Sequence, residues 1–255
     1  MAELYTTWKA IAVSGGDLTF WQSFFVKFYQ AFIEADRWTQ YLNGVKTTLF
    51  VTAMALILGL ILGLLVALIR TSHDQQRPGH KNPILFILNL ICKVYVTVIR
   101  GTPMMVQLLI MSFVIFASSR SFTMIGTLTL GLNSGAYVSE IIRGGLMSVD
   151  KGQMEAGQSL GLNYSTTMRF IVIPQAVKAI LPALGNEFIV LLKDTSLITV
   201  IGGKELLYAA QGIYNRTYEQ MFPLLGVALI YLVLVMILSW LLGKLERRLR
   251  QSDRR

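Results

Sequence analysis

Residues 149–174 read V-D-K-G-Q-M-E-A-G-Q-S-L-G-L-N-Y-S-T-T-M-R-F-I-V-I-P and decide how the rest of the chain is interpreted. The stretch is polar and carries both signs of charge, yet it lies between hydrophobic runs long enough to cross a bilayer. Asp150 is placed to cap a short helix, and Gly161 is placed to end it. Ser165 or Thr166 is placed to cap a second short helix. We therefore predict a rigid knob of two short helices, suited to docking a soluble partner.

The composition of the whole chain indicates its class. Of its 255 residues, 54% are hydrophobic and only 15% are charged, which is unlike soluble domains. The formal net charge is +9, but Lys and Arg gather at the ends of apolar runs, as membrane topology requires, so nucleic acid is not expected as a partner. Cys92 is the single cysteine, so neither a disulfide framework nor a thiolate metal cluster can form. An all-α polytopic membrane protein is predicted.

Five transmembrane helices are expected from the apolar runs. They cover residues 45–69, 103–117, 122–142, 179–201 and 223–242. A helix over residues 83–99 is expected to lie in the interface or face the cytoplasm, because Lys93 interrupts it and Pro103 breaks the run that follows.

Basic residues give this domain an orientation. The connector 70–81, with Arg77, His80 and Lys81, and the basic tail 244–255 are both expected in the cytoplasm. The N-terminus is then outside and the C-terminus inside the cell membrane. Residues 44–243 form the predicted transmembrane domain, in contact with membrane lipid, and residues 1–43 an extracytoplasmic or interfacial segment.

An aromatic pattern marks the N-terminal segment. Phe20, Phe24, Phe28 and Phe32 recur at every fourth position of a stretch over residues 19–33. The pattern predicts a helix with one broad aromatic face, too short and too amphipathic to insert fully, which lies in the membrane interface. An extra tilted span is the alternative.

Polar residues share one face of the predicted span 122–142. Asn133, Tyr137 and Glu140 are four and three residues apart, which places them on one side of a helix. A carboxylate within a span is costly unless it is paired or faces water, so this face is a candidate lining of a passage. The alternative is that Glu140 pairs with Arg143, which lies within one turn of it.

The knob also carries a recognisable motif. Glu155-Ala156-Gly157, Gly161 four residues later, and Ile171-Val-Ile-Pro174 nine residues beyond that resemble the E-A-A loop of binding-protein-dependent ABC transporter permeases, E-A-A-x3-G-x9-I-x-L-P. Gly157 stands where that loop has its third-position alanine, and Ile173 stands where it has leucine.

Further motifs resemble the polar amino acid branch of that family, the glutamine, histidine and arginine type permeases. They are Arg100-Gly-Thr-Pro103 with Gln107, Asn133-Ser-Gly-Ala-Tyr137 with Glu140 and Arg143-Gly-Gly145, and Lys193-Asp-Thr-Ser-Leu197 followed by Glu205-Leu206. The resemblance covers about residues 42–250.

The resemblance implies a type I ABC importer permease with five spans. Such a subunit pairs with a second permease subunit, either a copy or a different chain, and with two cytoplasmic ATPase subunits that hold ATP and Mg. A solute-binding protein feeds it from outside, and this chain itself carries no cofactor. The E-A-A loop seats in a groove of the ATPase, which implies that the ATPase-coupling residues are Glu155, Ala156, Gly157, Gly161 and Pro174.

A substrate pathway is expected from the polar residues of the spans. The candidate residues are Gln107, Asn133, Tyr137, Glu140, Asp194, Thr195 and Ser196. Asp194 is expected to meet the ammonium or amide of an amino acid in transit, although Lys193 and Asp194 pairing with other helices is the alternative. The polar and aromatic loop 202–222 is expected outside, where a binding protein docks.

Together these features predict the permease of an ATP-driven importer for polar amino acids. The chain has no G-x-x-x-x-G-K-[ST] loop, so ATP hydrolysis is expected on a partner. The alternative is a secondary transporter or channel that is not coupled to ATP. That class often shows inverted repeats, and the sequence has no convincing internal repeat.

Overall fold

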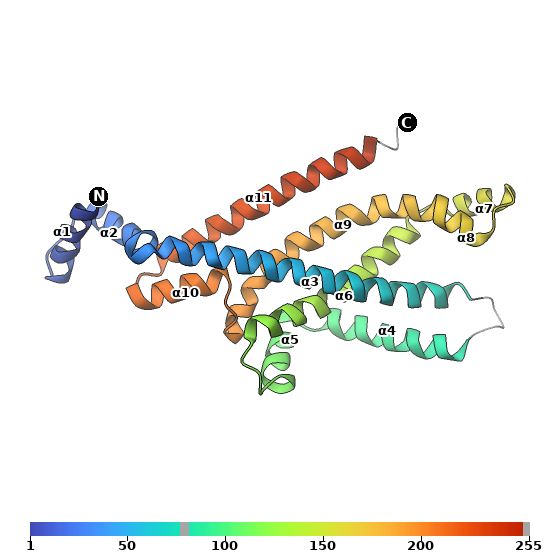
Figure 1. Cartoon of the computed structure of the whole chain (residues 1–255), viewed down its shortest axis with the longest axis horizontal. Coiled ribbons are helices and arrows are strands. Elements are labelled where there is room, and N and C mark those ends of the chain that lie inside the picture. Colours follow the sequence, from blue (N-terminus) through green and yellow to red (C-terminus); the bar gives the residue numbers. More distant parts are fainter. Residues whose placement is uncertain (77–81, 252–255) are drawn as a thin grey trace.

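The computed structural model describes residues 1–76 and 82–251 and shows an elongated bundle of helices (Figure 1). Arg77, His80 and Lys81 of the basic connector, and the end of the tail from residue 252 onward, lie outside the described residues. Within the described part, all regular secondary structure is helical.

Five long helices run roughly along the length of the molecule (Figure 1). They are α3 (Arg37–Asp74), α4 (Pro83–Gly101), α6 (Phe122–Met147), α9 (Ile173–Asp194) and α11 (Met221–Gln251). All but α6 are, or belong to, helical stretches that are long and apolar enough to cross a membrane. With 26 residues, α6 is about 39 Å long, which is sufficient to cross, but its polar face lowers its hydropathy. It packs extensively against α3 and α9.

The structure corrects the predicted roles of the two segments on either side of Pro103. The segment expected to be interfacial is α4, a continuous 19-residue apolar helix whose single Lys93 points outward and is exposed. The segment expected to span consists of α5 (Met104–Ile110) and a π-helical turn, Met111–Ile115. Its twelve residues extend about 18 Å, too short for a hydrocarbon core of about 30 Å.

Small residues bring α3 close to α6: Gly59 and Gly63 are four residues apart on one helix, a spacing that lets another helix approach closely. A Cβ atom on Gly63 would lie 2.5 Å from Cγ1 of Val138, and one on Gly59 would lie 2.8 Å from Oγ of Ser134. Both positions therefore require glycine for this approach of the two helices.

The N-terminal segment forms two short helices at one end of the molecule (Figure 1). They are α1 (Ala2–Val13) and α2 (Phe20–Phe32), and a 3-10 turn, Glu34–Asp36, leads into α3. At 13 residues, α2 is about 20 Å long, so the alternative of an extra span is wrong. The rings of Phe24 and Phe222 lie 4.9 Å apart and join α2 to the start of α11.

The same end of the bundle holds the segment between α9 and α11. A 3-10 helix, Thr195–Ile201, follows α9 directly and ends at Gly202, whose φ is +87°. Helix α10 (Leu206–Thr217) follows and packs against α3 and α11.

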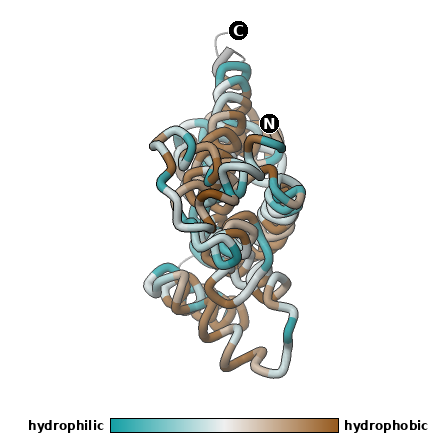
Figure 2. The backbone as a smooth tube through the Cα atoms, turned by 90° about the vertical axis from the view of Figure 1, so that its left-hand side faces the viewer, coloured by the Kyte–Doolittle hydropathy of each residue, from teal (hydrophilic) through white to brown (hydrophobic). Residues whose placement is uncertain are grey.

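Hydrophobic residues make up most of the chain, and hydrophilic residues gather in the connecting segments and toward the end of α11 (Figure 2). Many large apolar side chains on the long helices are exposed, such as Ile61 and Leu232. A soluble protein rarely leaves so many uncovered, whereas lipid covers them in a bilayer.

Candidate functional site

The predicted knob lies at the end of the molecule opposite α1 and α2 (Figure 1). Its first helix is α7 (Lys151–Ser159), and Asp150 caps it by accepting a hydrogen bond from the Gly152 N–H at 2.6 Å. At its end Gly161 has φ of +83°, and the Leu162 N–H donates to the Gly157 carbonyl at 3.1 Å. This closure satisfies carbonyls that the helix end leaves open, so both sequence predictions are confirmed.

The second half of the knob differs from the prediction. Asn163, rather than Ser165 or Thr166, caps α8 (Tyr164–Thr167) by accepting from the Thr166 N–H at 2.8 Å. This helix is not a separate short one, because a π-helical turn, Met168–Val172, joins it directly to α9.

Pro174 lies in the first turn of α9 without ending the helix. Just before it, the Ile173 N–H donates to the carbonyl of Met168, five residues back. Proline has no N–H and its ring crowds the carbonyl four residues back, and the wider π-turn accommodates this. The knob is therefore one short helix packed on the base of a long helix.

Gly157 forms the contact between these two parts. A Cβ atom at this position would lie 2.5 Å from Cγ2 and 2.8 Å from Oγ1 of Thr167, whose side chain is fully buried. This packing explains why glycine stands where the family motif has its third-position alanine.

Substituting Gly157 with alanine is expected to push α7 away from α8 and to lower the free energy of unfolding by about 1–3 kcal/mol, as overpacking does. Thr167→Ala in the same chain removes the opposing atoms and is expected to restore most of the loss. Gly144→Ala is the matched control, because a Cβ there meets nothing within 4 Å. Thermal unfolding in detergent measures all three, and strictly additive effects of Gly157→Ala and Thr167→Ala would contradict the contact.

One face of the knob is open to a partner. Glu155 and Ala156 are exposed on α7, and Leu160 at its tip is 81% exposed. The sequence reasoning did not single out Leu160; its signal is an apolar residue directly before the glycine of a polar turn.

Glu140 on α6 is paired, but not with its predicted partner. Its carboxylate accepts a hydrogen bond from Arg70 of α3, and Arg100 of α4 lies 3.5 Å from it. Arg143 instead lies 3.7 Å from Asp74, so the prediction of an Arg143–Glu140 pair is wrong. Glu140 therefore joins three helices.

Tyr137 lies beside this cluster and is 38% exposed. The Arg100 guanidinium lies 5.2 Å from the centre of its ring, within cation–π range. Tyr137, Glu140 and Arg100 thus form one polar group on the exposed side of α6.

Gln107 and Asn133 form a second group, at the break between α4 and α5. The Asn133 side-chain N–H donates to Oε1 of Gln107 at 3.0 Å. The Gln107 amide donates to the carbonyl of Ile99 at 2.7 Å and to that of Thr102 at 3.1 Å. Since Gln107 is largely buried and its amide is committed to these bonds, it positions Asn133 and closes the end of α4.

The third predicted group lies where α9 passes into its 3-10 extension. Asp194 is half-buried, and neither it nor Lys193 makes an ion pair within the described part of the chain. Thr195 is fully buried and donates to the Leu192 carbonyl at 2.7 Å. Ser196 donates to the carbonyl of Lys193 at 2.8 Å. Among the described residues, no hydrogen bond or ion pair joins this group to the α6 groups.

Two buried carboxylates complete the polar interior. Glu187 of α9 is 9% exposed and accepts from Ser134 Oγ of α6 at 2.8 Å. The sequence feature that points to Glu187 is its spacing of seven residues from Asp194, which places both carboxylates on one face of the helix. Glu205 is 2% exposed, and nothing in its sequence context indicates that burial. Among the described residues, no cluster of three or more His, Cys, Asp or Glu is placed to hold a metal.

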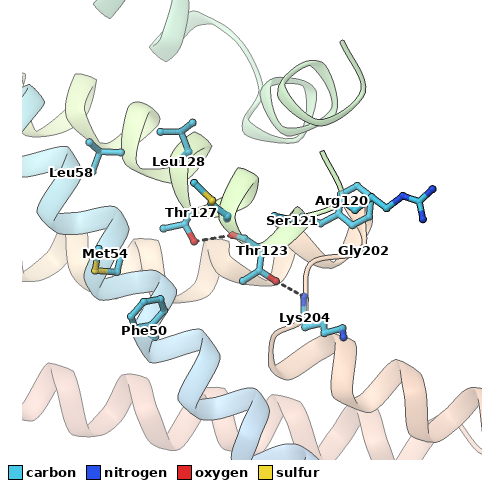
Figure 3. Close-up of a pocket in the computed structure, with 12 residues that line it drawn as sticks. Phe50, Met54, Leu58, Arg120, Ser121, Thr123, Thr127, Leu128, Gly202 and Lys204 are labelled. Atoms are coloured by element: carbon cyan, nitrogen blue, oxygen red, sulfur yellow. Dashed lines mark hydrogen bonds between the residues drawn. The ribbon is translucent and has the colours of Figure 1, made fainter. Parts of the chain in front are cut away.

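A cavity of about 760 Å³ lies between α3, the start of α6 and the segment after Gly202 (Figure 3). Its wall is mainly apolar, with Phe50 and Met54 on one side and Leu128 on another. At its edge the Lys204 N–H donates to Thr123 Oγ1 at 3.0 Å. None of the predicted pathway residues lines this cavity.

Two curated relatives cover most of the chain. The glutamine transport system permease protein GlnP of Escherichia coli (strain K12) is 37% identical over 216 residues, which are 82% of this chain and 92% of that protein. The putative glutamine transport system permease protein GlnP of Rickettsia typhi is 35% identical over 211 residues, with the same shares of each chain.

Solved structures share the architecture. The crystal structure of an amino acid ABC transporter with histidines matches with a TM-score of 0.75 and 40% identity, over 82% of this chain and 94% of that one. The MetNI methionine ABC transporter in inward-facing conformations matches with a TM-score of 0.68 over 85% of this chain and 99% of that one. At 18% identity the second match supports the fold alone.

The family comparison agrees with these relatives. Residues 84–251, which include the knob and the helices on both sides of it, match the family described as binding-protein-dependent transport system inner membrane component. The chain therefore belongs to this family.

Proposed function

We propose that the chain is the permease subunit of an ATP-driven importer for polar amino acids, of the glutamine type. The family match and the GlnP relatives support the class of transporter. The observation that carries the mechanism is that α7 packs through Gly157 onto a helix that continues without interruption to Asp194.

The topology proposed for this subunit has five spans, α3, α4, α6, α9 and α11. An odd number of crossings places the two termini on opposite sides of the membrane, and the basic end of α11 then assigns the C-terminus to the inside and the N-terminus to the outside. In support, α1 and α2 lie at one end of the bundle, while α7, α8 and the end of α3 lie at the other, toward which α11 also points (Figure 1). Arg247 and Arg248 of α11 and Arg70 near the end of α3 are then at the cytoplasmic side.

The ATPase subunits of the importer dock on the exposed face of α7, at Glu155, Ala156 and Leu160. When ATP draws the ATPases together, α7 moves as a body, because its ends are capped and its buried side is packed on α8. Because α8 continues into α9, the movement of α7 also shifts α9 and the Asp194 side chain at its far end. Alternating access requires such a contact, since a ligand shifts an equilibrium only by its differential interaction with the two states.

The substrate passes along a face that contains Asn133, Tyr137 and Asp194, in an assembly with a second permease subunit, either a copy of this chain or a different one. The Asp194 carboxylate, which has no ion-pair partner among the described residues, receives the ammonium group of the amino acid. Gln107 and Thr195 hold this lining in place rather than touching the substrate, as their committed hydrogen bonds suggest. A solute-binding protein delivers the substrate at the outer end, near α10.

Purification of the tagged chain from its native membrane, followed by reconstitution into vesicles, tests this function. ATPase subunits are expected to co-purify, and uptake of glutamine is expected to require ATP and the binding protein. A channel or secondary transporter would instead give uptake that follows an ion or substrate gradient. Absence of any ATPase from the complex, together with uptake that ATP does not change, would remove the importer function.

A further inference from the structure

Glu205 is the N-cap of α10, and its carboxylate is buried where four elements meet. Oε1 accepts hydrogen bonds from the Thr199 hydroxyl and from the Tyr208 N–H, the latter at 2.9 Å. Oε2 accepts from the Tyr231 hydroxyl at 2.7 Å and from the Thr48 hydroxyl at 3.4 Å. One side chain thus joins α3, the 3-10 helix after α9, α10 and α11.

The donors around Glu205 suit an ionised carboxylate, which is an acceptor only. No cation pairs with it in the described part of the chain, and at 2% exposure its burial is costly unless its oxygens are hydrogen-bonded. The four donors stabilise the carboxylate only when α3, α10 and α11 keep their present positions. The arrangement therefore makes the position of α10 depend on the helices that surround it.

The polar contacts continue from Glu205 toward the predicted pathway. The Tyr231 hydroxyl that donates to Glu205 also lies 3.5 Å from Oγ1 of Thr195, the residue directly after Asp194. Thr199, the other hydroxyl on this carboxylate from the same region, lies one turn further along the 3-10 helix. Hydrogen-bonding groups thus lead from the start of α10 to the end of α9.

The segment that carries Glu205 is held on both sides. The Lys204 N–H donates to Thr123 Oγ1 of α6 at 3.0 Å, as Figure 3 shows. On the other side, the Leu206 N–H donates to Thr48 Oγ1 of α3 at 3.2 Å. A displacement of α10 therefore has to move the 3-10 helix or break these bonds.

The outward side of α10 is accessible to a partner. A hollow of about 370 Å³, which Glu205 helps to line, lies between α10 and the start of α3. Tyr208 and Arg216 of α10 and Asn43 of α3 are among its lining residues. A protein that contacts this hollow from outside touches the turn that begins at Glu205.

We propose that Glu205 is a positioning residue that transmits contact of the solute-binding protein with α10, through Tyr231, to Thr195 and the neighbouring pathway. The inference rests on the proposed function, because it needs a binding protein outside and an ATPase inside. Coupling of this kind needs an element whose equilibrium both sites bias, and the 3-10 helix Thr195–Ile201 with its bonds to Glu205 is that element.

The test compares ATPase activity of the reconstituted complex with and without the solute-binding protein that co-purifies with the wild type, loaded with glutamine. Glu205→Gln and Tyr231→Phe are expected to lower the stimulation by the binding protein at least about fivefold, the lower end of coupling between sites. Basal ATPase activity and thermal unfolding are expected to stay close to wild type in Tyr231→Phe, which leaves the carboxylate three donors.

Glu219→Gln is the matched control, because this carboxylate lies at the same end of the bundle. It pairs with Lys27 at 2.9 Å and is not bonded to Tyr231 or Thr199. Wild-type stimulation in Tyr231→Phe and Glu205→Gln would overturn the proposal. A parallel fall of stimulation, basal activity and thermal stability would also overturn it, since that result assigns Glu205 to folding only. If the wild type itself is not stimulated, the proposed function fails, and the inference fails with it.

Discussion

Replacing Glu155 with arginine is expected to release the ATPase and to abolish ATP-driven uptake, while the permease stays folded. Glu155 is exposed on α7 and has no hydrogen-bond or ion-pair partner among the described residues. The charge reversal is therefore expected to change the free energy of unfolding by no more than about 0.5 kcal/mol. At the proposed interface the same reversal places an arginine where the partner receives a carboxylate. Such a mismatch costs several kcal/mol, and each 1.4 kcal/mol weakens association about tenfold.

Three measurements separate docking from folding in this variant. They are co-purification of the ATPase, ATP-dependent uptake in vesicles, and thermal unfolding of the permease in detergent. Glu246→Arg is the matched control, because it reverses a carboxylate at the same end of the molecule on α11, away from the knob. Unchanged uptake in Glu155→Arg would remove this residue from the interface, and equal losses in both variants would point to net charge at this end instead.

The knob shows why local features were predictable from sequence. Asp150 and Gly161 act on backbone groups within a few residues of themselves, so their roles follow from residue type and position alone. The close approach at Gly59 and Gly63 follows from a spacing within a single helix. The merger of α8 into α9 was missed, because the prediction of a second short helix did not foresee the π-turn that accommodates Pro174.

The polar interior shows where sequence reasoning ends. Glu140 meets Arg70 and Arg100, which are 70 and 40 residues away in the chain, whereas sequence spacing pointed to the nearby Arg143. These pairs depend on how α3 and α4 pack against α6. Glu205 belongs to a family motif, but its burial was not predicted for the same reason, because three of its four donors come from other elements. Hydropathy likewise assigned the wrong span on either side of Pro103, because a single exposed lysine was given too much weight.

Removing the Glu140 carboxylate is expected to destabilise the permease by about 1–3 kcal/mol. The Arg70 side chain is 13% exposed and loses its partner, but the Glu140 side chain is 35% exposed, so water screens the partly buried pair and the cost is below that of a fully buried one. Glu140→Ala is therefore expected to lower the midpoint of thermal unfolding in detergent more than Arg143→Met. The latter breaks a longer pair, to an Asp74 side chain that is 49% exposed, which contributes at most about 1 kcal/mol.

A double variant then distinguishes the two roles that the sequence left open for Glu140. In Arg70→Met with Glu140→Leu both charges are removed together, and replacing a buried pair by apolar side chains is often neutral for stability. If Glu140 only joins α3 to α6, uptake is expected to return with stability in the double variant. If it also lines the pathway beside Tyr137, the complex is expected to be stable but uptake to stay low, because Arg100 is then left without its carboxylate in the lining. Wild-type stability of Glu140→Ala would contradict the role in joining the helices, since a pair that can be broken without cost does not hold α3 and α4 on α6, and wild-type uptake in the double variant would contradict the lining role.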